Sequence, residues 1–142
     1  MKISERGLKL IREHEGCRLK AYYDAVGVLT IGYGSTRDVA PGMAITIEEA
    51  DARLVEDCAE AENCINGAVT VPLTQPEFDA LCSWVYNLGC GTFRKSSVLR
   101  YLNESNYDMA CARMKLYDKA GGQVLSGLTR RRMDEAKLFE SA

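Results

Sequence analysis

The chain has 142 residues, of which 46% are hydrophobic and 27% are charged, and its formal net charge is −2. This length and composition suit one globular domain with a hydrophobic core, and they exclude a disordered, collagen-like or coiled-coil protein. Because the net charge gives no global basic field, we expect no nucleic-acid partner.

The sequence also bears on where the protein is made. The first 16 residues hold seven charged side chains and no apolar segment, which excludes a secretory signal peptide. The longest uncharged stretch of note, residues 80–93, is too short to cross a bilayer. We therefore expect synthesis in the cytoplasm and no stable membrane insertion.

Six cysteines are scattered along the chain. No two have the Cys-x-x-Cys spacing of a zinc site, and His14 is the only histidine, so we expect no metal site. Cytoplasmic synthesis favours reduced thiols, and several of these cysteines occupy apolar helix positions, where a thiol packs as a small hydrophobe. The sequence predicts free thiols at Cys17, Cys58, Cys64, Cys82, Cys90 and Cys111.

The first predicted elements are a helix and a hairpin. A helix is expected over residues 4–14, with Ser4 as its N-cap and apolar residues at helical spacing. Residues 17–34 carry aromatic and β-branched side chains on both sides of a turn at 24–27, which predicts a β-hairpin. A third short strand or a loop is expected over residues 35–44.

Two capping boxes predict the longer helices. Thr46 with Glu49 begins a helix that should end at Gly67, and the same pattern at Thr74 begins a strongly apolar helix that should end near Gly89. Three shorter helices follow, at about residues 96–102, 106–117 and 129–139.

Together these elements predict one α+β domain over residues 1–142. A small β lobe covers about residues 16–45. A larger helical lobe covers about residues 68–142 together with the N-terminal helix. The long helix joins the two lobes, and we expect a cleft between them.

Three residues near this cleft have side chains suited to glycoside hydrolysis. Glu15 ends the first helix, Asp24 lies at the hairpin turn and Thr30 lies in the returning strand. Two carboxyl groups across a glycosidic bond can protonate the leaving oxygen and activate water. With 20 acidic residues in the chain, this spacing alone favours the plainer roles of a helix end, a turn former and a strand residue.

The sequence around these residues resembles the active-site block of the phage lysozymes of glycoside hydrolase family 24. That block has Glu-Gly, then Leu-x-Ala-Tyr-x-Asp, then Gly-x-x-Thr-Ile-Gly-x-Gly, and it corresponds here to residues 15–16, 19–24 and 27–34. The similarity continues in chain order through residues 42–46, 71–75 with 78–81, 87–89, 119–122 and 127–132.

The resemblance implies a lysozyme-like fold and hydrolysis of the β-1,4 bond between N-acetylmuramic acid and N-acetylglucosamine, with inversion and without a cofactor. It implies that Glu15 is the general acid, Asp24 the second carboxylate and Thr30 a residue that helps to place water. Tyr22, Gly34 and Ser35 would line the cleft, and Ser35 stands where many members carry histidine.

The resemblance also implies a biological setting and leaves two rivals. We expect a monomer that waits in the host cytoplasm until a holin opens the membrane, and then acts on peptidoglycan in the periplasm. One rival is a lytic transglycosylase, which has little need of Asp24 or Thr30. The other is a module that binds or disrupts membranes through Arg130–Arg132, although such a basic run is usually a solvated helix face.

Overall fold

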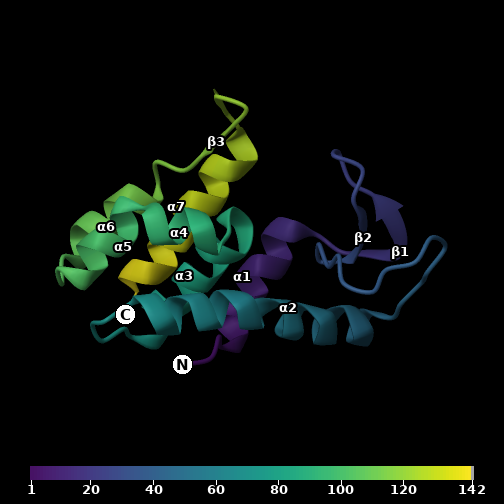
Figure 1. Ribbon diagram of the computed structural model, residues 1–142, viewed down its shortest axis with the longest axis horizontal. Coiled ribbons are helices and arrows are strands. Elements are labelled where there is room, and N and C mark those ends of the chain that lie inside the picture. The colour runs from purple at the N-terminus through teal and green to yellow at the C-terminus, as the bar shows by residue number, and fades with distance from the viewer. Residues whose placement is uncertain (142) are drawn as a thin grey trace.

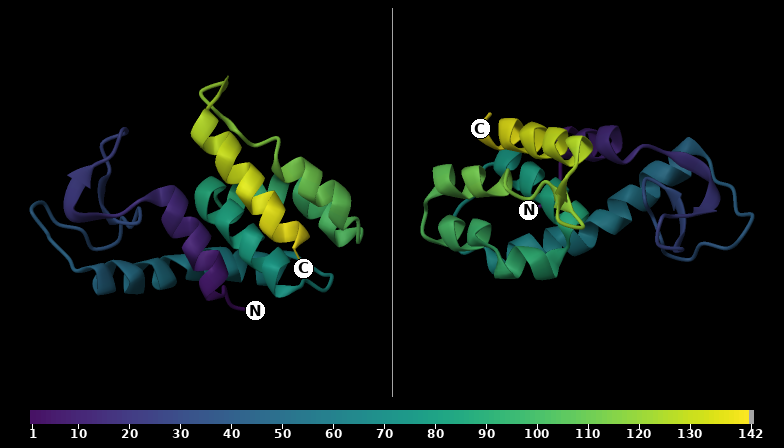
Figure 2. Two further views of the ribbon diagram at one scale, coloured as in Figure 1. Left: turned by 180° about the vertical axis from the view of Figure 1, so that it is seen from behind. Right: turned by 90° about the horizontal axis from the view of Figure 1, so that it is seen from above.

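The computed structural model describes residues 1–141 (Figure 1). The long helix α2 runs beneath the whole molecule, with a β-hairpin over one end and a cluster of helices over the other (Figures 1 and 2). In chain order the elements are α1 (Glu5–Glu15), β1 (Arg18–Tyr23), β2 (Leu29–Gly32), α2 (Ile47–Ala68), α3 (Gln75–Leu88), α4 (Cys90–Lys95), α5 (Ser97–Asn103), α6 (Tyr107–Met114), β3 (Lys119–Ala120), β4 (Gln123–Val124) and α7 (Ser126–Glu140).

Both predicted capping boxes are present, and they begin the helices α2 and α3. The Glu49 amide donates to Thr46 Oγ1 at 3.1 Å, and the Thr46 amide donates to the Glu49 carboxylate at 3.2 Å. Thr74 and Glu77 repeat the arrangement at the start of α3. Since each box satisfies two amides that a helix start leaves unpaired, local sequence alone fixes where α2 and α3 begin.

Ser4 is the N-cap of α1, as predicted, but its side chain does not cap the helix. Its hydroxyl donates instead to the carboxylate of Asp79 on α3, and its amide donates to Asp79 Oδ1 at 2.9 Å. Gly7 lies over the same residue, where a Cβ would come within 2.8 Å of Asp79 Cβ. This close packing of α1 on α3 fixes the direction in which α1 carries its last residue, Glu15.

Three features of the helical lobe differ from the predicted elements. Helix α4 was not expected. Gly89, at φ 92°, ends α3 and lets the chain turn directly into this new helix. Gly121 and Gly122 do more than end a helix: both have positive φ and form the turn of the β3–β4 hairpin. Helix α7 begins at Ser126, three residues before the predicted start.

Two clusters of buried side chains hold these elements together. The larger surrounds α3, where Trp84 packs edge-on against Phe93 and Tyr117. The smaller includes Ile11 and Ile31, and joins the end of α1 to β2 and to the first half of α2. The second cluster places the hairpin relative to α1, so that the chain just after Glu15 starts the β lobe.

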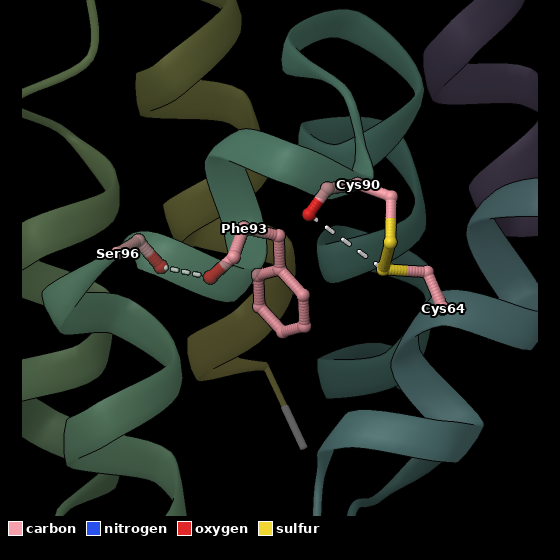
Figure 3. The surroundings of a disulfide bond; sticks show 4 residues. All are labelled: Cys64, Cys90, Phe93 and Ser96. Carbon is pink, nitrogen blue, oxygen red and sulfur yellow. Dashed lines mark hydrogen bonds between the residues drawn. A yellow bond between two sulfur atoms is a disulfide. The ribbon is translucent and has the colours of Figure 1, made fainter.

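A disulfide joins Cys64 near the end of α2 to Cys90 at the start of α4 (Figure 3). The prediction of free thiols is therefore wrong for these two residues. They are 26 positions apart in the sequence, yet the fold brings their Cα atoms to 5.9 Å, a separation ordinary for a disulfide. Among the described residues the other four cysteines are free: Cys17, Cys58, Cys82 and Cys111.

Thiol titration distinguishes these classes of cysteine. Burial raises the pKa of Cys58 and of Cys111 to about 12 and raises that of Cys82 further. Since the thiolate is the reacting form, these three groups should be inert at pH 8, and half-buried Cys17 alone should react quickly in the native protein. Unfolding without reductant should give the four free thiols, and prior reduction all six. Six reactive thiols in the unreduced, unfolded protein would contradict the disulfide.

Candidate functional site

Glu15 is the last residue of α1, and Gly16 ends the helix with φ 70°. The Glu15 side chain is 22% exposed, and its Oε2 accepts a hydrogen bond from Arg131 Nη1 on α7 at 2.7 Å. The carboxylate therefore stands where α1, the β lobe and α7 meet, and one of its two oxygens is fixed by a guanidinium.

The arginine that holds Glu15 belongs to a buried charge network. Arg131 also contacts Glu135 Oε2 at 3.3 Å, and Arg132 contacts Glu135 Oε1 at 2.7 Å. The Ser83 hydroxyl donates to Glu135 Oε2 at 2.6 Å. Arg131 and Arg132 are only 4% and 0% exposed, so the expected solvated helix face is wrong for both, and only Arg130 of that run is exposed.

Burial shifts the pKa values of two members of this network in opposite directions. It raises the pKa of Glu135 and lowers that of Arg132, because each loses water around its charged form. The opposite charge of the partner counteracts each shift. Glu135 is the carboxylate shared by both arginines, and its removal would leave Arg132 without a negatively charged partner.

Two hollows in the surface meet at Glu15 and Asn87, which line both. The first, of about 510 Å³, lies between the loop after β2 and the helices α2 and α3. The second, of about 750 Å³, lies between the end of α1 and the start of α7. The first is lined by Glu15, Gly34, Thr36, Arg37, Glu56, Asp57, Glu60, Ala61, Val85, Tyr86, Asn87, Gly89 and Cys90.

Gly34 leaves open space beside the free oxygen of Glu15. A Cβ at Gly34 would lie 3.5 Å from Glu15 Oε1 and 3.8 Å from the Tyr86 hydroxyl, and the glycine has φ 92°, which side-chain-bearing residues rarely adopt. Tyr86 donates to the Tyr33 carbonyl oxygen at 2.9 Å, and burial raises the pKa of Tyr86 well above its usual value, so it remains a donor. Gly34, one of the predicted cleft residues, therefore lines the first hollow.

Asp24 and Thr30 make local contacts within the hairpin. Asp24 Oδ1 accepts from the amides of Val26 at 3.0 Å and Val28 at 2.8 Å, so it stabilises the turn. Thr30 is buried, and its hydroxyl donates to the Val28 carbonyl oxygen at 2.9 Å. Neither is among the described residues that line the two hollows, and their catalytic roles stay predictions.

Tyr22 and Ser35 are also absent from the described lining of the hollows. The Tyr22 ring packs under the Arg18 guanidinium, 4.1 Å from its carbon to the ring centroid. Ser35 is 2% exposed, and its hydroxyl accepts from Arg53 Nη1 of α2 at 3.2 Å. Their contacts with substrate stay predictions too.

Sequence reasoning missed three residues of the site. Asn87 lines both hollows, Arg37 lines the first, and Arg131 holds Glu15. A signal for Arg131 was available, because Glu135 follows it at the i,i+4 spacing of a helical ion pair. No local pattern marks Arg37 or Asn87, since the groups they face come from other elements.

Residues 1–141 also bear on membrane insertion and metal binding. None of the helices there is both long and apolar enough to cross a bilayer. In the same part of the chain, no cluster of three or more His, Cys, Asp or Glu side chains is arranged to hold a metal ion.

Comparison with known proteins relates this site to a family. The model of the family "Phage lysozyme" matches residues 12–135. An endolysin of Acyrthosiphon pisum secondary endosymbiont phage 1 is 45% identical, with all of both chains covered. Phage P22 lysozyme, solved as a mutant, is 42% identical with a TM-score of 0.93, and the muramidase domain of SpmX from Asticaccaulis excentricus is 39% identical with a TM-score of 0.94; each match covers 99% of both chains.

These matches extend over nearly the whole chain, and they include the block around Glu15 from which the resemblance was inferred. The predicted lysozyme-like α+β fold, with its helical majority and small hairpins, is confirmed. The chain belongs to the phage lysozyme family, and it is a lysozyme.

Proposed function

We propose that this chain is an endolysin that hydrolyses the β-1,4 bond between N-acetylmuramic acid and N-acetylglucosamine in peptidoglycan. One observation carries the proposal: Glu15 lies at the junction of two hollows, with Oε2 held by Arg131 and Oε1 beside Gly34. A glycan strand laid through both hollows would pass over this carboxyl group at their junction.

In the proposed reaction, Glu15 gives its proton to the glycosidic oxygen as the bond from that oxygen to C1 breaks. Asp24 takes a proton from water, whose oxygen bonds to C1 from the opposite face, and Thr30 helps to place that water. Arg131 is positioned to stabilise the Glu15 carboxylate that remains after proton transfer. The products are two shorter strands, one with a new reducing end.

The remaining site residues have positioning roles in this proposal. Gly34 leaves room for a sugar next to Glu15, while Tyr22 and Ser35 shape the β-lobe side of the cleft. Two carboxyl groups suffice for the chemistry, so the proposal requires no cofactor or metal. We further propose a monomer that is held in the host cytoplasm and reaches the periplasm when a holin permeabilises the inner membrane.

The general acid is tested by Glu15→Gln. Glutamine keeps an oxygen for Arg131 but has no acidic proton, so the rate of peptidoglycan hydrolysis should fall by at least about 100-fold while the fold persists. Turbidity clearance of outer-membrane-permeabilised Gram-negative cells measures the rate, and circular dichroism the fold. Glu48→Gln, at an exposed position on α2, is the matched control and should keep full activity. A Glu15→Gln rate within threefold of the unmodified protein would refute the assignment.

The water-activating role is tested by Asp24→Asn. Asparagine retains the oxygen that accepts from the Val26 and Val28 amides, so the turn should survive, while loss of the base should slow hydrolysis by about 100-fold or more. Mass spectrometry of digested peptidoglycan supplies the second measurement. Reducing ends are expected from the unmodified enzyme, whereas anhydro ends, lighter by one water, would instead indicate a transglycosylase.

The release step is tested in cells that express the protein without a holin. Their optical density should remain steady until chloroform permeabilises the inner membrane, and then fall rapidly. Cells that express Glu15→Gln are the control, and should show no comparable fall after chloroform. Prompt lysis before chloroform would contradict the requirement for a holin.

A further inference from the structure

The loop between β2 and α2 forms the β-lobe wall of the first hollow. Gly34, Thr36 and Arg37 from this loop line the hollow, and Gly34 lies beside Glu15. The loop has little regular structure, and Asp38 adopts a left-handed conformation with φ 48°, which is unfavourable for a residue other than glycine. Such a segment keeps one conformation only if its surroundings hold it.

One arginine from α2 holds the loop by its backbone. Arg53 Nη1 donates to the Arg37 carbonyl oxygen at 2.6 Å and to Ser35 Oγ at 3.2 Å, and Arg53 Nη2 donates to the Asp38 carbonyl oxygen at 3.3 Å. Three acceptors within four consecutive loop residues thus bind one guanidinium. The contact fixes the path of the backbone and not only one side chain.

A second arginine makes the reverse contact, from the loop to α2. Arg37 Nε donates to Asp57 Oδ1 at 2.6 Å, and Arg37 Nη2 donates to Glu56 Oε2 at 3.0 Å. The Asp57 side chain is 13% exposed and the Glu56 side chain 66% exposed, so the Asp57 contact is better shielded from water and is the stronger of the two. Arg53 and Asp57 are four residues apart and lie on one face of α2.

We propose that Arg37 and Arg53 are positioning residues that set the width of the glycan groove by fastening its β-lobe wall to α2. Each arginine reaches in the opposite direction, so the loop cannot move away from the helix without breaking both sets of contacts. Ser35, which stands where many family members carry histidine, acts through Arg53 in this arrangement.

The proposal rests on the proposed function, because the groove it describes is the one assigned to the glycan. If the fastening is lost, Gly34 is free to move away from Glu15 and the hollow widens. The Glu15–Arg131 contact comes from α1 and α7 and remains in place. Loss of either arginine should therefore weaken substrate binding far more than it slows the chemical step.

The test uses Arg37→Ala and Arg53→Ala with soluble peptidoglycan fragments of defined length. Each variant should raise KM by about tenfold, since each removes hydrogen bonds that a charged guanidinium donates, while kcat stays within about twofold. Arg53→Lys should recover only part of the loss, because an ammonium cannot present a planar fork to three acceptors. Arg94→Ala removes the same charge from an exposed position on α4 and is the matched control.

A binding measurement separates this proposal from the proposed function. In the Glu15→Gln background, which cannot hydrolyse the fragment, calorimetry should show Kd rising by the same factor for Arg37→Ala and Arg53→Ala. Fragment binding and hydrolysis that are unaffected by either substitution would overturn the fastening role alone. A fall in kcat at constant KM would also overturn it. Failure of the unmodified protein to hydrolyse the fragments would instead overturn the proposed function.

Discussion

The buried arginine pair of α7 is the constraint on which the site depends. Arg131 and Arg132 carry two positive charges into the interior, where the carboxyl groups of Glu15 and Glu135 contact them. Glu135 contacts both arginines, so its loss would leave Arg132 buried without a carboxylate partner and would cost roughly 3–5 kcal/mol. Since Glu15 comes from α1 and the arginines from α7, these contacts also join α1 to α7 at the proposed general acid.

Local sequence predicted those features whose causes are local. The capping boxes at Thr46 and Thr74 fixed two helix starts, and the turn at Asp24 fixed the hairpin, because in each case the interacting groups lie within four residues of one another. Cys64 and Cys90 gave no such signal, since their partners are set by how α2 packs beside α4. The spacing of Arg131 and Glu135 indicated an ion pair but not its burial, since a run of three arginines indicates solvent until α1 and α3 are placed against it.

The groove has two walls, and α2 anchors both. On the β-lobe side, Arg53 and Asp57 hold the loop that carries Gly34. On the helical side, the disulfide bond to Cys64 restrains Cys90, which lines the same hollow together with Gly89. A disulfide that closes a loop of this length stabilises a fold by roughly 3 kcal/mol in the chain-entropy description. One helix therefore serves as the common reference for two walls that come from distant parts of the sequence.

Two separate sets of contacts therefore determine the shape of the site. Along α2, ion pairs and a covalent bond set the spacing of the walls. Other contacts set the position of the Glu15 carboxyl group between those walls. They are the packing of α1 on α3, with Gly7 against Asp79, and the contact of Arg131 with Glu15. Because the two sets share no residue, a change in the spacing of the groove need not move Glu15. The hydrogen bond from Arg53 to Ser35 belongs to the first set only, so it bears on how the β-lobe wall is held and not on the contact between Glu15 and Arg131.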